Sequence, residues 1–344
     1  MAEQLSNSGG TGLVPVPPGK VAASRRKSPE EAARGSGRRK ENRTGLVLIA
    51  PTVIIVVVVV VLPIIWSISL AFQHVQLINL RNSSLFGNYT LRNFEQVLSA
   101  PGFVETLITT VLYSVLGTAA SIGLGLIAAL ALRGRFRGRG LVRSTMLLPY
   151  VAPVVAVTAT WQIMLSPQFG FINYWGEQLF GWTQPLAFLT DKSTDALIFG
   201  LTIPIPTALI TVIVFEAWRQ FPFAFLFLTA RMQAMPVSLE EAARVDGATI
   251  SQRFRYILWP QLLPTIGVLA VLRFIWTFTS FDDIYLLTGG GAGTEVISVR
   301  VYNFLTGRGD IGLASAQALV IAIVLAVFVA VYVRFFSKRE EDVA

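Results

Sequence analysis

The sequence predicts an all-α, polytopic helical membrane protein with six transmembrane helices. Of its 344 residues, 53% are hydrophobic and the mean hydropathy is +0.61, a balance that soluble domains of this length rarely reach. Several apolar stretches have the roughly 20 residues that a helix needs to cross a hydrocarbon core about 30 Å thick. Lys and Arg gather in alternate connecting segments, as the positive-inside rule requires of a protein with several spans.

The apolar stretches set the six expected spans. The fourth is longer than one crossing needs and contains Pro204, Pro206 and Pro222. Dividing it into a hairpin would move later basic segments to the wrong side of the membrane, so we keep it as one span. The expected spans are residues 45–72, 104–132, 144–165, 197–230, 261–287 and 311–336.

The positions of the basic residues test this topology. With the N-terminus inside, the inside segments hold 21 Lys or Arg, and the outside segments hold five. The sequence therefore predicts that both termini are cytoplasmic.

Two tails flank the predicted spans. Residues 1–44 are rich in Gly, Ser, Pro and Arg, a composition that cannot bury a core and that predicts a disordered basic cytoplasmic tail. We expect one membrane domain of six spans at 45–337 and a short cytoplasmic tail at 338–344. The basic end of the first tail suits contact with anionic membrane lipid.

Composition excludes several kinds of chemistry. The chain has no Cys and one His, which excludes disulfides, thiol catalysis and Cys-ligated metals. The lone His74 ends the first apolar stretch and indicates an interfacial residue, not a metal ligand. The net charge of +8 does not indicate nucleic-acid binding, because the basic residues lie beside the spans. Asp282 and Asp283 lack partner groups for acid–base catalysis, so we expect no enzyme active site.

Small residues recur at every fourth position of the second span. They are Gly117, Ser121, Gly125 and Ala129. Such a stripe lets another helix approach closely.

The segment 236–260 separates the fourth and fifth spans and carries charged residues. Ser238 and Glu241 fit a capping box, and Thr249 with Gln252 fits a second one. Gly247 lies between them and suits the left-handed conformation that ends a helix. The segment therefore predicts a short helix, a glycine elbow and a second helix, with Pro260 marking the turn into the next span.

The sequence "EAARVDGATISQRFRYILWP" resembles the EAA motif of binding-protein-dependent ABC transporter permeases. Trp259 stands where the motif usually has Leu. We call residues 236–260 the EAA loop. The resemblance implies that it couples the chain to an ATPase through Glu241, Ala242, Ala243, Asp246, Gly247, Ile257 and Pro260.

Other segments resemble the carbohydrate-uptake branch of these permeases, the MalF-like or UgpA-like half. They are "GNYTLRNFEQVL", "LLPYVAPVVAV", "EAWRQFPF" and "FDDIYLLTGGGAGTE". The resemblance covers about residues 45–337. Ala292 departs from it, because that branch often has Pro there.

The resemblance implies a type I ABC importer permease fold in the bacterial inner membrane. The chain has no G-x-x-x-x-G-K-[ST] phosphate loop, so it needs a separate motor. The implied partners are a sister permease, two ATPase subunits that bind ATP and Mg²⁺, an external solute-binding protein and a sugar substrate. We expect no cofactor in this chain itself.

The resemblance also implies a substrate path. Polar groups and aromatic faces suit sugar hydroxyls and rings. For Glu216 and Arg219, three residues apart, a structural ion pair on one helix face remains the alternative. For Phe223 and Trp276 the alternative is core packing. The path residues are Glu216, Trp218, Arg219, Gln220, Phe223, Trp276, Thr277 and Ser280.

Two other functions are weighed against sugar import. An importer for glycerol 3-phosphate or another polyol remains open, because that substrate belongs to the same branch. A secondary transporter would need coupling acids in mid-span and often inverted repeats, which this sequence does not display. A scaffold or sensor would need a soluble signalling domain, and the tails are too short and too polar for one.

Overall fold

The computed structural model describes residues 48–82, 84, 87–134, 136–198 and 201–341. The chain divides into two compact units between Pro63 and Ile64, and each is described by itself. The expected tail 1–44 lies outside the described residues.

The described part of the first unit is an apolar helical segment. Within it, the turn η1 (Val57–Val61) is a π-helix inside a run of six consecutive valines. β-branched side chains crowd an α-helical turn, and a wider turn relieves that crowding.

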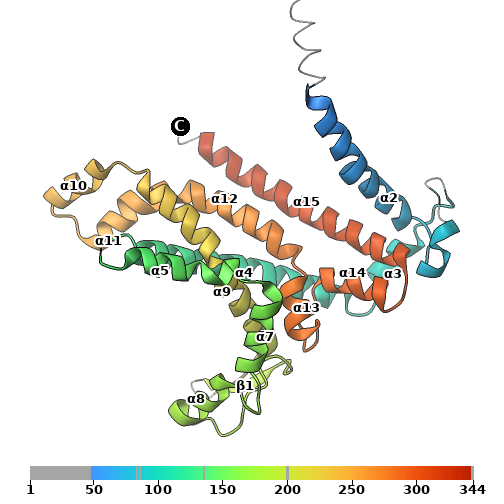
Figure 1. Cartoon of the computed structure of the whole chain (residues 1–344), viewed down its shortest axis with the longest axis horizontal. Helices are drawn as coiled ribbons and strands as arrows, with labels where there is room; N and C mark the ends of the chain where they lie inside the picture. Colours follow the sequence, from blue (N-terminus) through green and yellow to red (C-terminus); the bar gives the residue numbers. More distant parts are fainter. Residues whose placement is uncertain (1–47, 83, 85–86, 135, 199–200, 342–344) are drawn as a thin grey trace, which may run out of the picture. The chain divides into compact units, whose positions relative to one another are not determined.

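The second unit is almost entirely helical (Figure 1). Its first helix, α2, crosses the unit boundary, because it begins two residues before Ile64. Its elements in chain order are α2 (Leu62–Ala71), η2 (Leu77–Asn82), α3 (Arg92–Ser99), α4 (Phe103–Ala131), α5 (Arg139–Met146), α6 (Leu148–Val151), α7 (Val154–Met164), α8 (Phe171–Phe180), β1 (Thr194–Ile198), β2 (Leu201–Ile205), α9 (Thr207–Gln233), α10 (Val237–Val245), α11 (Ile250–Arg253), η3 (Phe254–Leu258), α12 (Trp259–Phe278), α13 (Asp282–Thr288), α14 (Ile297–Thr306) and α15 (Ile311–Glu341).

Among the described residues, five helices are long and apolar enough to cross a membrane. A sixth span results if the pair Arg139–Val151 and Val154–Met164, bent by 95°, counts as one. The predicted fold class is confirmed, and the predicted third span is this bent pair. The bend falls at Ala152, whose ψ of 143° is extended. A residue before proline avoids the α conformation, and Pro153 follows it.

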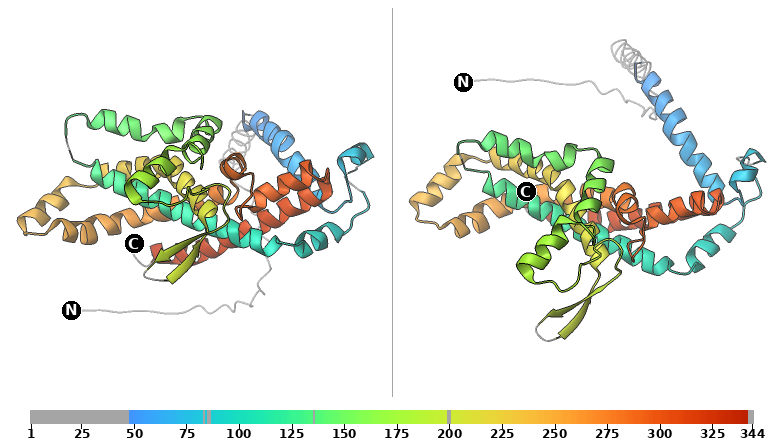
Figure 2. Two further views of the ribbon diagram at one scale, coloured as in Figure 1. Left: turned by 90° about the horizontal axis from the view of Figure 1, so that it is seen from below. Right: turned by 60° about the horizontal axis from the view of Figure 1, so that its bottom comes forward.

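The predicted start of the fourth span is wrong. Residues 197, 198 and 201–205 belong to an antiparallel pair of strands, β1 and β2, in which Thr194 pairs with Ile205. Helix α9 begins only at Thr207, after Pro206. Proline ends strand pairing and favours a helix start, so this part of the apolar stretch does not continue the helix. Both views of Figure 2 show this pair of strands projecting from the helices of this unit.

The fifth span also differs from the prediction. One helix runs from Ile250 to Phe278, so the expected turn at Pro260 is absent from the described chain. The π-helix η3 precedes this proline, and the Trp259 N–H bonds to the Phe254 carbonyl five residues back. A wider turn accommodates the hydrogen bond that proline cannot make. The predicted end at 287 lies in the separate helix α13, so α12 is shorter at that end.

Helix α4 packs most extensively against α9. The predicted small-residue stripe explains this, because Gly117, Ser121, Gly125 and Ala129 are all buried. A Cβ on Gly125 would lie 2.7 Å from the Cβ of Ala224 and 2.8 Å from the backbone nitrogen of Phe225. Hydrogen at this position lets the two backbones approach.

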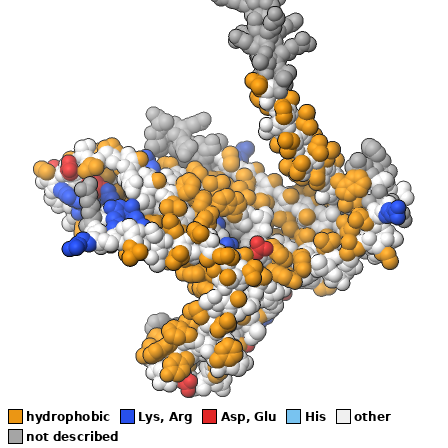
Figure 3. All heavy atoms as spheres, in the orientation of Figure 1, with side chains coloured by type: hydrophobic (Ala, Val, Ile, Leu, Met, Phe, Trp, Pro, Cys, Tyr) orange, Lys and Arg blue, Asp and Glu red, His pale blue; other side chains and the backbone are white. Residues whose placement is uncertain are grey.

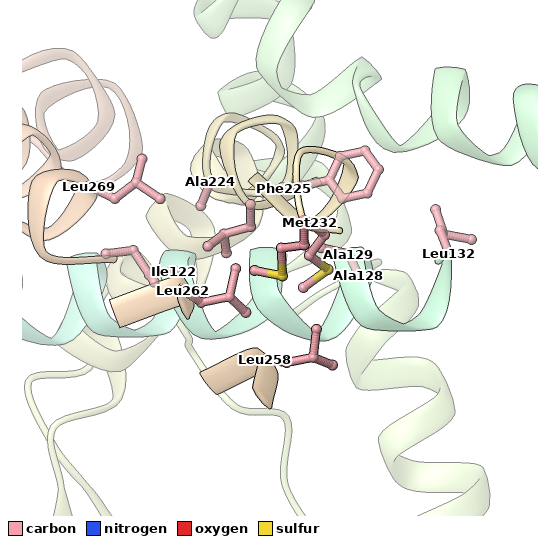
Figure 4. Close-up of a cluster of buried hydrophobic side chains, with 12 residues drawn as sticks. Ile122, Ala128, Ala129, Leu132, Ala224, Phe225, Met232, Leu258, Leu262 and Leu269 are labelled. Atoms are coloured by element: carbon pink, nitrogen blue, oxygen red, sulfur yellow. The ribbon is translucent and has the colours of Figure 1, made fainter. Parts of the chain in front are cut away.

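One apolar cluster joins α4, α9 and α12 near the EAA loop (Figure 4). Leu258 near the end of the loop and Leu262 just after it both belong to this cluster and are buried. Buried apolar contacts therefore fix where the EAA loop enters the bundle.

The loop between α13 and α14 contains the one described non-glycine residue with positive φ, Ala292 at +51°. Proline is held near −65° and cannot take this conformation. The loop therefore has a backbone shape that a proline at this position would forbid.

Candidate coupling loop and substrate path

The EAA loop begins at α10 without the expected side-chain cap. The helix starts at Val237, and Pro236 occupies the N-cap position with no side-chain cap hydrogen bond. The predicted capping box of Ser238 and Glu241 is therefore wrong. Pro236 has φ −60° and ψ 125°, so the restricted φ of proline begins the helix one residue early and places Ser238 inside it.

The predicted glycine elbow is confirmed. Gly247 has φ +76°. The Ala248 N–H bonds to the Ala243 carbonyl at 2.9 Å, and the Gly247 N–H bonds to the Arg244 carbonyl at 3.1 Å. This pair of bonds is a Schellman motif, which satisfies the last carbonyls of α10 and turns the chain.

The second capping box is also confirmed. The Gln252 N–H donates to Thr249 Oγ1 at 3.3 Å, and the Thr249 N–H donates to Gln252 Oε1 at 2.8 Å. Two N–H groups at the start of α11 thus have partners. The elbow and the cap together set the angle between α10 and the helix that enters the bundle.

The EAA loop exposes apolar side chains. Val245 is 88% exposed and Ile250 is 79% exposed, while no residue of α10 is buried. Glu241, Ala242 and Asp246 are exposed as well. Figure 1 places α10 and α11 at one end of the α9 and α12 helices. Exposed apolar side chains at a projecting helix pair mark a surface suited to contact with another protein.

An ion pair that we did not predict holds α10 to the bundle. Arg133, just after α4, pairs with Glu240 in the first turn of α10. The only feature of the sequence that pointed to this pair was the group of arginines directly after the second predicted span.

Two of the predicted path residues belong to a buried polar network. Glu216 of α9 pairs with Arg273 of α12 at 2.5 Å, and Thr277 Oγ1 donates to Glu216 Oε1 at 3.0 Å. Glu216 and Thr277 are each only 1% exposed. This network ties α9 to α12 next to Gly117, where a Cβ would meet Glu216 Cγ at 3.1 Å.

Arg219 has a different partner from the expected one. The alternative of a Glu216–Arg219 pair on one helix face is wrong, because Arg219 pairs with Asp283 of α13 at 2.9 Å. Asp283 is fully buried. A buried charge needs a close partner, and here the partners come from neighbouring helices. Arg273 and Asp283 were absent from the predicted site, although an ionisable residue in or beside a span was the signal that could have included them.

Two other predicted residues meet in an aromatic cluster. The rings of Phe223 and Trp276 lie 5.1 Å apart, and Phe223 also contacts Phe227 at 4.7 Å. Trp276 is 47% exposed. An aromatic face that remains exposed can stack on a ligand ring, while a fully packed one cannot.

The three remaining path residues belong neither to the buried polar network nor to the Phe223–Trp276 cluster. Trp218 lies 5.4 Å from Trp161 of α7, and Gln220 is half-buried on α9. Ser280 is half-buried between α12 and α13, and its carbonyl accepts a bond from Ser298 Oγ at 2.5 Å. The structure thus joins Glu216 with Thr277 and Phe223 with Trp276.

The bundle of spans, with its buried ion pairs and projecting loop, defines a multi-pass membrane transport protein. More narrowly, the chain belongs to the family described as "Binding-protein-dependent transport system inner membrane component", which residues 121–341 match. Members of this family are ABC transporter permeases and not enzymes, so the predictions of a multi-pass inner-membrane permease and of no enzyme are confirmed.

Three curated relatives illustrate the family. The inner membrane ABC transporter permease protein YcjO of Escherichia coli (strain K12) is 32% identical over 261 residues, 76% of this chain and 83% of that protein. The trehalose/maltose transport system permease protein MalF of Thermococcus litoralis is 35% identical over 232 residues, with coverages of 67% and 73%. The sn-glycerol-3-phosphate transport system permease protein UgpA of Agrobacterium fabrum is 34% identical over 253 residues, with coverages of 72% and 80%.

Solved structures share the fold. A chain of a bacterial ABC transporter involved in the import of the acidic polysaccharide alginate matches with a TM-score of 0.73 and 22% identity, over 89% of this chain and 99% of that one. A bacterial alginate ABC transporter in complex with an alginate pentasaccharide-bound periplasmic protein matches with a TM-score of 0.72 and 22% identity, over 86% and 94%. At this identity the likeness concerns the fold.

Proposed function

We propose that this chain is the permease subunit of an ATP-driven importer for sugars. It forms the translocation path with a sister permease, and an external solute-binding protein delivers the sugar. Two ATPase subunits bind ATP and Mg²⁺ on the cytoplasmic side, where both termini of this chain lie. The trehalose/maltose permease among the relatives supports the substrate class.

The observation that carries the coupling proposal is the geometry of the EAA loop. A Schellman elbow at Gly247 and a capping box at Thr249 set the angle between α10 and the long helix containing α12. A push on the exposed α10 is therefore transmitted to a helix that continues through the bundle. We propose that Glu241, Ala242 and Asp246 contact the ATPase, since all three are exposed.

We propose that the substrate path follows the partly exposed members of the predicted set. Trp276 and Phe223 provide ring faces, and Gln220 provides an amide for hydroxyl groups. The fully buried Glu216 and Thr277 hold α9 against α12 beside the path. Their role is to position the path, because buried groups already bonded to one another are not available to a sugar.

Import of glycerol 3-phosphate is the second candidate, supported by the UgpA relative. A phosphate ester needs cationic groups. Here Arg273 and Arg219 are each paired with a carboxylate, and this charge balance favours an uncharged sugar.

The test is transport by the complete complex, purified with its partner subunits and reconstituted in vesicles. ATP-dependent uptake is measured for each labelled sugar of a panel and for labelled glycerol 3-phosphate, alone and in competition with one another. We expect one sugar to be taken up and glycerol 3-phosphate to compete poorly. Uptake of glycerol 3-phosphate alone would select the second candidate, and uptake without ATP would refute both.

Topology has its own test. Single cysteines at positions 138 and 341 should resist a membrane-impermeant thiol reagent in intact cells, while one at 192 should react. Labelling at 138 would refute the proposed orientation.

A further inference from the structure

A pocket of about 310 Å³ lies where four helical elements meet. It is bounded by the end of α4, by α5, by the end of α9 and by the first turn of α10. We call it the arginine pocket, and its polar lining residues are Arg133, Arg139, Arg143, Thr229, Gln233 and Glu240. Figure 3 shows basic side chains gathered at the end of the molecule that carries α5 and α10.

The arginine pocket has an excess of positive charge. Its one acid, Glu240, pairs with Arg133. Among the described residues, Arg139 and Arg143 form no ion pair with a carboxylate. They lie four residues apart on α5 and therefore on the same face of that helix. Two cations held this close repel each other unless an anion joins them.

The same pocket contains polar atoms without hydrogen-bond partners. In the described part of the chain, Arg139 Nε, Arg143 Nε and Thr229 Oγ1 are buried and make no hydrogen bond. Arg143 uses another nitrogen to donate to the Leu132 carbonyl at 3.2 Å. Buried donors without partners are costly, so three of them on residues that line one pocket indicate a missing acceptor.

The chemistry of these donors identifies the acceptor. Guanidinium groups bind phosphate with paired hydrogen bonds, and a hydroxyl can add a further one. The pocket begins directly after the α4 span, which ends at Ala131, at the depth where phospholipid headgroups lie. We propose that the arginine pocket binds the phosphate group of an anionic phospholipid or of a free phosphate ion.

An anion bound in the arginine pocket would lie next to the EAA loop. An anion between Arg139 and Arg143 lies beside the Arg133–Glu240 pair, which holds the first turn of α10. Occupancy therefore acts directly on the ion pair that attaches α10 to the end of α4. This effect on transport rests on the proposed coupling role of α10, whereas the binding itself does not.

The experiment uses the full-length chain purified in detergent with the subunits that accompany it. Native mass spectrometry measures the binding of dioleoyl phosphatidylglycerol, of dioleoyl phosphatidylcholine and of inorganic phosphate. The test variant is Arg139→Gln with Arg143→Gln. The matched control is Arg137→Gln, which removes an exposed arginine just before α5 and outside the pocket.

We expect phosphatidylglycerol to bind more tightly than phosphatidylcholine, and the double variant to lose about tenfold or more of that affinity. The control should bind as the wild type does. Competition by inorganic phosphate would identify a free anion as the natural ligand, and lack of competition would identify the lipid. Equal binding of both lipids and of phosphate by wild type, variant and control would overturn the proposal.

A second variant distinguishes loss of the binding site from misfolding. Arg139→Lys with Arg143→Lys keeps both charges and should retain more anion affinity than the Gln pair at equal complex yield. Binding is measured without any sugar, so a complex that binds the anion but imports no sugar would refute the proposed function and leave this inference standing.

Discussion

The buried ion network and the EAA loop hold charged residues in opposite ways. In the bundle, Glu216 and Arg273 are each about 1% exposed and bonded to each other. In the loop, Glu241 and Asp246 are exposed, and backbone geometry sets the shape. The bundle therefore depends on packing and charge compensation, whereas the loop depends on local conformation and leaves its surface free.

The largest effect is expected from breaking the buried pair. Arg273→Met leaves the Glu216 carboxylate buried without its partner, at a cost of about 3–5 kcal/mol. We expect a low yield of assembled complex and a lower melting temperature. Purification yield and thermal unfolding in detergent measure both.

The control is the double variant Glu216→Leu with Arg273→Met. It removes both charges and should recover most of the stability. If the double variant assembles well but does not transport, the pair serves the substrate path directly and not only the packing of α9 on α12.

The close approach of α4 and α9 is the next feature to test. Gly125→Ala places a methyl group 2.7 Å from the Cβ of Ala224, so the helices must separate, at a cost of about 1–3 kcal/mol. Gly123→Ala is the matched control, because a Cβ there meets no atom within 4 Å. Thermal unfolding should show a loss for Gly125→Ala alone, and equal behaviour of the two would contradict close packing at Gly125.

The glycine of the EAA loop, Gly247, is required for its backbone conformation and not for close packing. A Cβ on Gly247 meets no atom within 4 Å, but its φ of +76° is unfavourable for other residues. Gly247→Val should cost about 1–2 kcal/mol locally and alter the angle of the elbow. We expect loss of substrate-stimulated ATP hydrolysis, while capture of sugar by the external binding protein continues.

Asparagine provides the control at this elbow. Gly247→Asn should retain coupling, because asparagine tolerates the left-handed conformation. Normal stimulated ATP hydrolysis in Gly247→Val would show that the elbow does not serve coupling.

A smaller effect is expected in the aromatic cluster. Trp276→Ala removes a half-exposed ring that contacts Phe223, a contact worth about 0.5–1.5 kcal/mol. Transport per reconstituted complex should fall several-fold with unchanged affinity at the binding protein. Phe227→Ala removes another neighbour of Phe223 and is the packing control. Equal losses in both variants would support packing over a substrate contact.

The smallest effect concerns the two expected capping boxes. Thr249→Ala removes an observed cap and should cost about 0.5–1 kcal/mol. Ser238→Ala should cost little, because no side-chain cap hydrogen bond begins α10. Hydrogen exchange of the α10 and α11 amides distinguishes them, and faster exchange only in Ser238→Ala would contradict the observed start of α10.

Sequence alone determined the features that depend on near neighbours in the chain. Apolar run length set the number of spans, with a sixth only if the bent pair counts as one, but not the start of the fourth span or the end of the fifth. The conformational freedom of Gly247 set the elbow, and the spacing of Thr249 and Gln252 set a cap. The small-residue stripe indicated a close helix contact but could not identify α9 as its partner.

The tertiary structure decided which distant groups meet. Glu216 and Arg219 are three residues apart, yet their partners are Arg273 and Asp283 on other helices. Sequence spacing describes one helix face, whereas a buried charge pairs with the group that packing brings closest. The same reason applies to Arg133 and Glu240, which are 107 residues apart and meet only because the ends of α4, α9 and α10 fold together.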